Sequence, residues 1–102
     1  MKANVESTVK RSYIRYRFIY VRKKDWDLFP AFTKTLELET DVAIIETQFY
    51  VGRYRGFSRN LKPWFEAHPE LKEGDKLIIK VRESESGKQY RLLSPKEQKE
   101  VA

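Results

Sequence analysis

Two stretches of similar chemistry decide the fold that this sequence predicts. Residues 13–22 read YIRYRFIYVR, and residues 48–55 read QFYVGRYR. Aromatic and β-branched side chains dominate both stretches, which favours β-strands. Because side chains alternate between the two faces of a strand, the first stretch would present an aromatic face around Phe18 and an opposite face with Arg15 and Arg17. We therefore expect one aromatic and basic strand in each stretch.

The similarity of these stretches indicates an internal repeat. A shift of 34 residues places Tyr16 on Tyr50 and Tyr20 on Tyr54, and acidic and isoleucine identities follow in the same order. Each unit would contain an aromatic and basic strand, a short helical segment, an acidic turn and an apolar strand. Coincidence between two ordinary strands is the alternative explanation.

We accordingly predict a small single domain of the α+β class, built from two diverged strand-helix-strand repeats. Its sheet would be mainly antiparallel, or a partial barrel, with short helices. The domain would span residues 1–102, with repeat 1 at about 12–46, repeat 2 at about 47–81, and a C-terminal hairpin strand and tail at 82–102.

Local signals predict where the helical segments begin. Asp25 or Asp27 would cap the first segment, and Asn60 would cap the second. Residues 94–97 read SPKE, a capping box with proline at the first helical position. This box opens a short C-terminal helix, or a frayed tail.

A hairpin is predicted near the C-terminus. Leu77, Ile79 and Val81 alternate with a mostly charged set in residues 76–82, and a polar turn ending in glycine would return the chain as a second strand at 88–93. Residues 1–9 carry no comparable signal, and we expect them to be disordered.

The composition points to an intracellular protein of a prokaryotic host. The 102 residues include no cysteine, which excludes disulfide bonds and cysteine-ligated zinc. No apolar run approaches the roughly 18 residues that a membrane span needs, so we expect no membrane partner. The first residues lack the apolar segment of a secretory signal, so we expect a cytoplasmic location. Abundant Lys and Glu with only 2 Asn and 3 Gln favour a hyperthermophilic source.

Positive charge is concentrated in two blocks of the chain. Residues 1–24 carry eight basic and one acidic side chain, and residues 47–62 carry four basic and none acidic. Residues 25–46 have a net charge of −5, and residues 63–102 are balanced. The excess of +6 therefore lies in the blocks that contain the two expected aromatic and basic strands.

These blocks favour binding to nucleic acid, either DNA or RNA. Basic side chains release counterions when they meet phosphates, arginine can contact guanine edges, and interleaved tyrosines can stack on unpaired bases. The candidate contact residues are Arg15, Arg17, Arg22, Lys23, Arg53, Arg55 and Arg59. Solvated charge on an aggregation-resistant edge strand and an acidic protein partner are the alternatives.

A groove between the two repeats is an alternative binding site. Two copies of one motif form a pseudo-two-fold unit, and an extended peptide could pair with a free strand edge there. The walls of this groove would be Tyr20, Trp26, Tyr54 and Trp64. The favoured alternative is that both tryptophans are core anchors. The protein could also be a homodimer or another oligomerising structural component.

Nothing in the sequence favours catalysis, a metal or another cofactor. His68 is the one histidine, it lies between Ala67 and Pro69, and no cysteine accompanies it, so we expect a solvent-exposed or turn-stabilising role. Glu37 and Glu39, with acidic residues nearby, are expected to form a solvated face. The glycines form no phosphate-cradling loop. We expect a non-catalytic binding module.

Residues 56–83 resemble known DNA-binding domains. The segment GFSRNLKPWFEAHPELKEGDKLIIKVRE contains a short helical segment, an L-x-x-GD turn and an apolar strand. In this order it resembles the AbrB-like and B3-like families, and the resemblance implies a swapped-hairpin or pseudobarrel fold that binds DNA. Repeat 1 departs from the pattern, because Thr40 stands where Gly74 stands in repeat 2. In size and composition the chain is also similar to small orphan proteins of viruses that infect hyperthermophilic archaea, which implies a virus-infected host.

Overall fold

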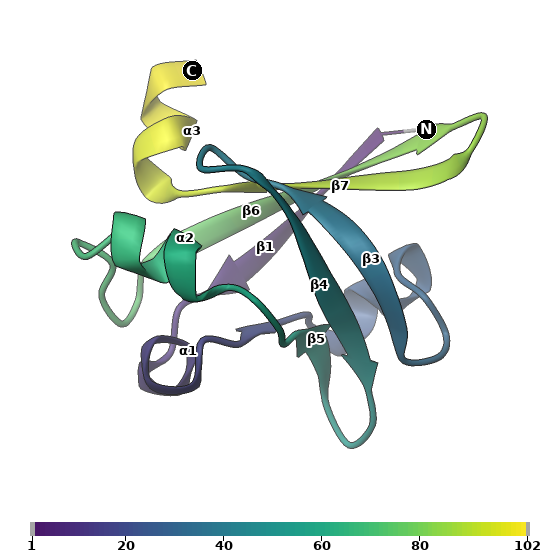
Figure 1. Ribbon diagram of the computed structural model, residues 1–102, viewed down its shortest axis with the longest axis horizontal. Helices are drawn as coiled ribbons and strands as arrows, with labels where there is room; N and C mark the ends of the chain where they lie inside the picture. Colours follow the sequence, from purple (N-terminus) through teal and green to yellow (C-terminus); the bar gives the residue numbers. More distant parts are fainter. Residues whose placement is uncertain (1, 102) are drawn as a thin grey trace.

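One seven-stranded sheet curls into a nearly closed barrel and forms the body of the protein (Figure 1). The computed structural model describes residues 2–101. The strands are β1 (Lys2–Thr8), β2 (Ile19–Tyr20), β3 (Lys34–Glu39), β4 (Ile44–Val51), β5 (Arg55–Phe57), β6 (Lys76–Ser84) and β7 (Gly87–Leu93). The helices are α1 (Arg11–Tyr16), the 3-10 helix η1 (Lys23–Leu28), α2 (Lys62–Ala67) and α3 (Pro95–Val101).

The strands lie in the order β1-β6-β7-β3-β4-β5-β2, and neighbours are antiparallel except for the parallel pair β3 and β7. The parallel pair is short and joins Leu38 to Tyr90 and Glu39 to Arg91. The α+β class, with a mainly antiparallel sheet or partial barrel and short helices, is therefore confirmed.

The interior of the barrel is filled by aromatic and aliphatic side chains. Phe29, the residue directly after η1, stacks on Phe49 of β4 and on Tyr90 of β7, at 5.1 Å and 5.2 Å between ring centroids. These contacts connect the end of η1 to two strands of the sheet. Trp64 of α2 is fully buried and closes one end of this core. Fully burying such side chains stabilises a fold by about 1.5–3 kcal/mol each.

The N-terminal segment is a strand and not a disordered tail. β1 pairs with β6 over its whole length, and Val5 and Val9 are fully buried. The expectation of disorder is therefore wrong for residues 2–8, while residue 1 lies outside the described part. β1 and β2 are the two edge strands of the sheet. Ser7 Oγ of β1 donates a hydrogen bond of 2.6 Å to the Tyr20 carbonyl of β2, which brings the two edges together and nearly closes the barrel.

The strand predicted at 13–22 is wrong over most of its length, because residues 13–16 are helical. Residues 11–16 form α1, and only Ile19 and Tyr20 join the sheet. The helix ends at Arg17, whose left-handed backbone (φ 53°) lets the Phe18 amide donate to the Tyr13 carbonyl at 3.3 Å. Tyr13 is the side chain that α1 buries, and its hydroxyl lies 2.7 Å from Ser7 Oγ.

The second stretch, 48–55, forms a hairpin. It begins inside β4, turns at residues 52–54 and enters β5. Tyr16 therefore lies in a helix, whereas Tyr50, which the shift of 34 residues places on it, lies in a strand. The two aligned stretches form different elements, and the duplication stays a prediction.

The C-terminal half follows its local signals closely. The hairpin of β6 and β7 forms as expected, with Gly87 at φ 116° in its turn. The Ser94–Glu97 capping box also forms, because the Glu97 amide donates to Ser94 Oγ at 3.2 Å and the Ser94 amide donates to Glu97 Oε1 at 3.0 Å. The cap of α2 was wrongly placed: Leu61 is the N-cap, and the Asn60 amide group donates to the Glu46 carbonyl instead.

The helices in the described part of the chain are short. None of them is long and apolar enough to cross a membrane.

Candidate nucleic-acid interface

Two segments that are distant in the sequence meet at one end of the barrel. Residues 11–28 contain α1, β2 and η1, and residues 51–55 contain the turn from β4 to β5. We call these two segments together the basic end. They lie in the lower part of Figure 1.

The pairing of β2 with β5 joins the two segments. Tyr20 lies opposite Gly56, and the Val21 amide donates to the Arg55 carbonyl at 2.9 Å. A side chain at Gly56 would collide with the Ile19 carbonyl oxygen and the Phe18 ring. Only glycine allows β2 to approach β5 this closely, so Gly56 helps to assemble the basic end.

The charge of the basic end accounts for the charge of the whole protein. Its two segments contain eight cationic and two acidic side chains, a net of +6, which equals the net charge of the chain. All other residues together are neutral. A field of one sign at one end of a small domain attracts anionic partners and orients their approach.

Aromatic rings fill the space between the two segments. Phe18 and Tyr20, which follow α1, contact Tyr54 of the turn at 5.3 Å and 5.2 Å between ring centroids. Tyr50 lies 5.4 Å from Tyr54 on its other side. Tyr54 is 47% exposed, so the cluster has a face that is open to a ligand.

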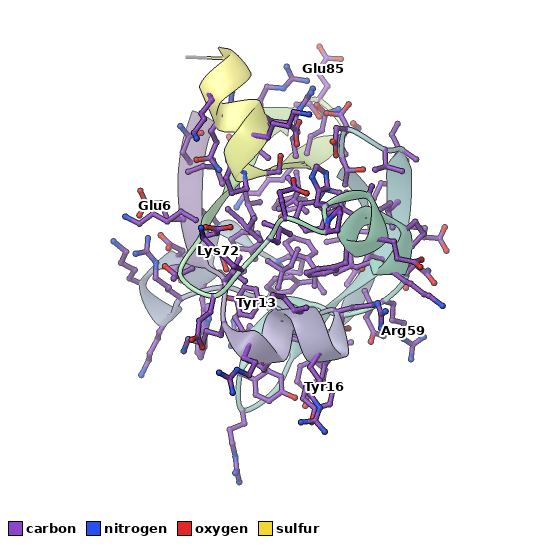
Figure 2. All side chains as sticks on the ribbon, turned by 90° about the vertical axis from the view of Figure 1, so that its left-hand side faces the viewer. Glu6, Tyr13, Tyr16, Arg59, Lys72 and Glu85 are labelled. Atoms are coloured by element: carbon purple, nitrogen blue, oxygen red, sulfur yellow. The ribbon has the colours of Figure 1, made fainter. Side chains whose placement is uncertain are left out.

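The exposed tyrosine of α1 adds a second aromatic surface. Tyr16 is 67% exposed and points away from the body of the protein, whereas Tyr13 points into it (Figure 2). The Arg15 guanidinium lies over the Tyr16 ring at 5.4 Å from its centroid. An arginine and a tyrosine that already stack on each other present a flat, cationic surface.

The predicted arginines of the basic end differ in solvent exposure and in the contacts of their side chains. Arg15 and Arg53 are exposed. Arg17 is half-buried, and its Nε has no hydrogen-bond partner among the described residues. Arg55 is half-buried too, because its guanidinium lies over the Trp26 ring at 4.3 Å from the centroid.

The other three predicted cations are less central. Arg22 forms an ion pair with Asp25 at 3.3 Å, and Lys23 is exposed at the start of η1. Arg59 follows β5 and lies to one side of Tyr16 in Figure 2. The structure therefore places Arg15, Arg17, Arg53 and Arg55 in the two segments of the basic end, with Arg17 also lining a depression beside Phe65 and His68, and leaves Arg59 outside the basic end.

The residues of the predicted peptide groove do not form one wall. Tyr20 and Tyr54 are in contact, and Trp26 is half-buried beneath Arg55, with its Nε1 donating to the Val21 carbonyl at 2.9 Å. Trp64 is 0% exposed and belongs to the core, where it packs against Phe65. It is the core anchor of the alternative interpretation and cannot line a surface groove.

The lone histidine lies in a cluster that the sequence did not reveal. His68 is only 5% exposed, which corrects the expectation of a solvent-exposed role. Its Nε2 lies 2.9 Å from Asp41 Oδ2, and its Nδ1 lies 3.2 Å from Glu70 Oε1. Asp41 comes from the turn between β3 and β4 and is exposed, and it also contacts the buried His68 ring.

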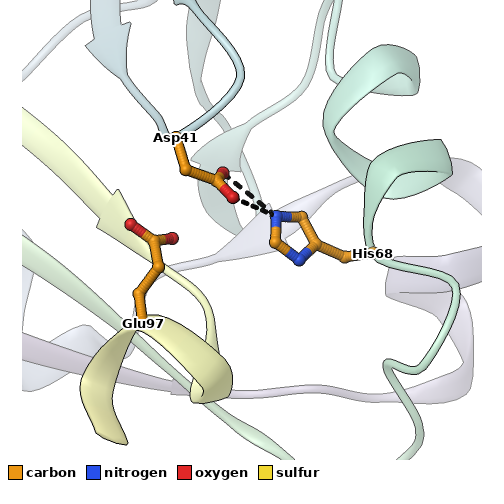
Figure 3. Close-up of side chains that lie close together, drawn as sticks. All are labelled: Asp41, His68 and Glu97. Atoms are coloured by element: carbon orange, nitrogen blue, oxygen red, sulfur yellow. Dashed lines mark hydrogen bonds and ion pairs between the residues drawn. The ribbon is translucent and has the colours of Figure 1, made fainter. Parts of the chain in front are cut away.

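The chemistry of this cluster is that of an ion-pair clamp. Burial lowers the pKa of His68, but the hydrogen bonds with Asp41 and Glu70 outweigh burial and raise the pKa above its ordinary value. The His68 ring also brings Asp41 near Glu97 of α3 (Figure 3), and potential ligand atoms of the three residues lie within 4.8 Å of one another. Protonated His68 would therefore connect the β3–β4 turn to the end of α2. Glu70 is two residues from His68, but Asp41 is 27 positions away, and no local pattern could have indicated that contact.

Comparisons with known proteins inform the fold. No family model matches the chain, and no curated protein matches it. Among solved structures, the chain is similar to the N-terminal domain of Helicobacter pylori LlaJI.R1, with a TM-score of 0.62 and 11% sequence identity. The similarity covers 91% of this chain and 81% of that one. At this identity the likeness supports the fold alone, and the resemblance of residues 56–83 to the AbrB-like and B3-like families stays a prediction.

Proposed function

We propose that this protein is a non-catalytic module that binds nucleic acid through its basic end. The observation that carries the proposal is the coincidence of the entire net charge of +6 with a cluster of partly exposed tyrosines. Polyanions with aromatic bases are the ligands that such a surface fits best. The barrel is compatible with the pseudobarrel that the resemblance of residues 56–83 implies.

Phosphate contacts would come first from the exposed arginines. Arg15 and Arg53 are exposed and can reach a phosphate backbone, whereas Arg17 is half-buried and its Nε is shielded from solvent. Each phosphate contact releases counterions from the DNA. In duplex DNA, each contact makes the slope of log K against the logarithm of the salt concentration more negative by about 0.9. Arg55 and Arg22 would contribute less, because Trp26 and Asp25 already hold them.

Base contacts would come from the tyrosines. Tyr54 projects between the two segments, and Tyr16 lies on the outer side of α1. Stacking on an aromatic side chain stabilises a single-stranded complex by about 1–3 kcal/mol per base. A single strand can use both phosphates and bases at this surface, whereas an intact duplex offers mainly phosphates and groove edges.

The alternative, a groove that binds an extended peptide, has weaker support. Trp64 is buried, and β2 exposes an edge of only two residues. Tyr20 and Tyr54 remain at the basic end, where they serve the nucleic-acid proposal equally well.

Titrations with labelled DNA and RNA test the proposal. The wild-type protein should bind with a steep negative dependence of affinity on salt. The variant Arg15→Gln/Arg17→Gln/Arg53→Gln should bind more weakly and lower the slope by up to about 2.7, at about 0.9 for each of three contacts. The control variant Lys72→Gln/Lys96→Gln/Lys99→Gln loses the same charge from exposed positions elsewhere and should keep most of the affinity. Absence of binding at low salt, or equal losses in both variants, would refute the proposal.

A further inference from the structure

A second group of cations lies outside the basic end, on the outer face of β1, β6 and β7. It surrounds a depression of about 560 Å³ whose polar lining consists of Asn4, Glu39, Lys80, Arg82, Gln89 and Arg91. None of these residues belongs to the basic end. The alternating pattern of β6 produces this face, because Leu77, Ile79 and Val81 point into the core and the intervening side chains point outward.

The register of the sheet places like charges side by side. Lys80 lies directly opposite Arg91, with Asn4 on its other side, and Arg82 lies opposite Gln89. Like charges that face each other across neighbouring strands destabilise a sheet. In the lining of the depression Glu39 is the one carboxylate, and it lies 3.9 Å from Arg91. Three cations with one carboxylate, which pairs with Arg91, leave an excess of positive charge that an anion would stabilise.

The spacing of the cations fits a chain of phosphates better than one compact anion. Lys80 and Arg82 are two residues apart on one strand, which separates them by about 6.6 Å along it. Successive phosphates of a nucleic-acid strand have a similar separation. The amide of Gln89, which already accepts from the Arg82 guanidinium at 2.6 Å, orients that arginine on the face.

We infer that this depression is a second phosphate-binding surface, which contacts the sugar-phosphate backbone of a bound nucleic acid through Lys80, Arg82 and Arg91. The inference rests on the proposed function, because it assigns a further contact surface for the same class of partner. In this proposal the basic end supplies the aromatic contacts, and the outer face of β6 and β7 supplies further phosphate contacts.

A triple variant tests this surface. Lys80→Gln/Arg82→Gln/Arg91→Gln removes three exposed cations and should lower the slope of log K against log salt by up to about 2.7 on a duplex that is long enough to span the protein. The melting temperature should stay the same or rise, because the opposed pair Lys80 and Arg91 is relieved. The variant Lys72→Gln/Lys96→Gln/Lys99→Gln is the matched control for charge.

The outcomes separate this inference from the proposed function. If wild-type protein binds no nucleic acid, the proposed function fails and this surface fails with it. If wild-type protein binds and the basic-end variant weakens it, but the outer-face variant has the slope and affinity of the control, only the second surface is refuted. A lower slope together with an unchanged or higher melting temperature supports it.

Discussion

A rise in pH through the titration range of His68 should weaken the fold by a bounded amount. The imidazole lies between two carboxylates, from Asp41 and Glu70, and Glu97 of α3 is close by. Burial lowers the pKa of His68, but the hydrogen bonds and charges of Asp41 and Glu70 outweigh this effect and raise the pKa above 6.5. Lys96 acts on Glu70 and does not contact the ring.

The direction in which stability changes with pH follows from proton binding. Because the pKa of His68 is higher in the folded state than in the unfolded state, the folded protein holds the proton more tightly. The stabilisation is complete below about pH 6.5, the unfolded value, and is lost as the pH rises through the folded value. The chain has one histidine, so the contribution of its imidazole to the free energy of unfolding cannot fall faster than about 1.4 kcal/mol per pH unit.

Urea unfolding between pH 5.5 and 8.5 measures this effect. Trp64 is a convenient fluorescent reporter, because its ring lies 4.8 Å from the His68 ring. The variant His68→Gln should lose the pH-dependent part, and Asp41→Asn should reduce it, since one hydrogen-bond partner of the ring is neutralised. A wild-type stability that does not change with pH in this window, or the same slope in His68→Gln, would refute the ion-pair clamp.

Three further predictions concern the barrel and its basic end. Gly56→Ala should destabilise the protein by about 1–3 kcal/mol in urea unfolding, because a Cβ there meets the backbone of Ile19. Gly52→Ala should destabilise it less, because the added Cβ meets the Tyr50 side chain, which can move. Trp64→Ala should cost about 3–5 kcal/mol of stability by the same measurement, and a smaller loss would mean that the core collapses around the cavity. Tyr54→Ala should weaken binding of single-stranded DNA by about 1–3 kcal/mol while Tyr54→Phe keeps it, and equal effects of both variants would argue against stacking.

Features encoded by short stretches of sequence could be predicted, and features that depend on distant partners could not. The hairpin of β6 and β7 follows from alternation and a glycine turn, and the helix after Ser94 follows from its capping box. β1 has no such signal, because it becomes a strand through pairing with β6 more than 60 residues away. The helix α1 was missed because aromatic and β-branched residues suggested a strand, while burial of Tyr13 and the left-handed Arg17 favour a helix.

The candidate site also has some features that the local sequence predicted and others that depend on distant partners. The charge blocks were visible in the sequence, and the pairing of β2 with β5 brings the two aromatic and basic stretches together. The sequence could not reveal that Arg55 stacks on Trp26, or that Trp64 is buried. The cations of β6 and β7 were visible as an alternating pattern, but their opposition across the sheet depends on the register.

The most direct test of the central claim is an NMR titration of isotope-labelled protein with a DNA oligonucleotide at low salt. The account predicts that the largest changes in backbone amide shifts occur in α1, β2, η1 and the β4–β5 turn, with a second group in the outer-facing residues of β6 and β7. No shift changes at saturating DNA, or changes confined to α2 and α3, would contradict the claim that the basic end binds nucleic acid.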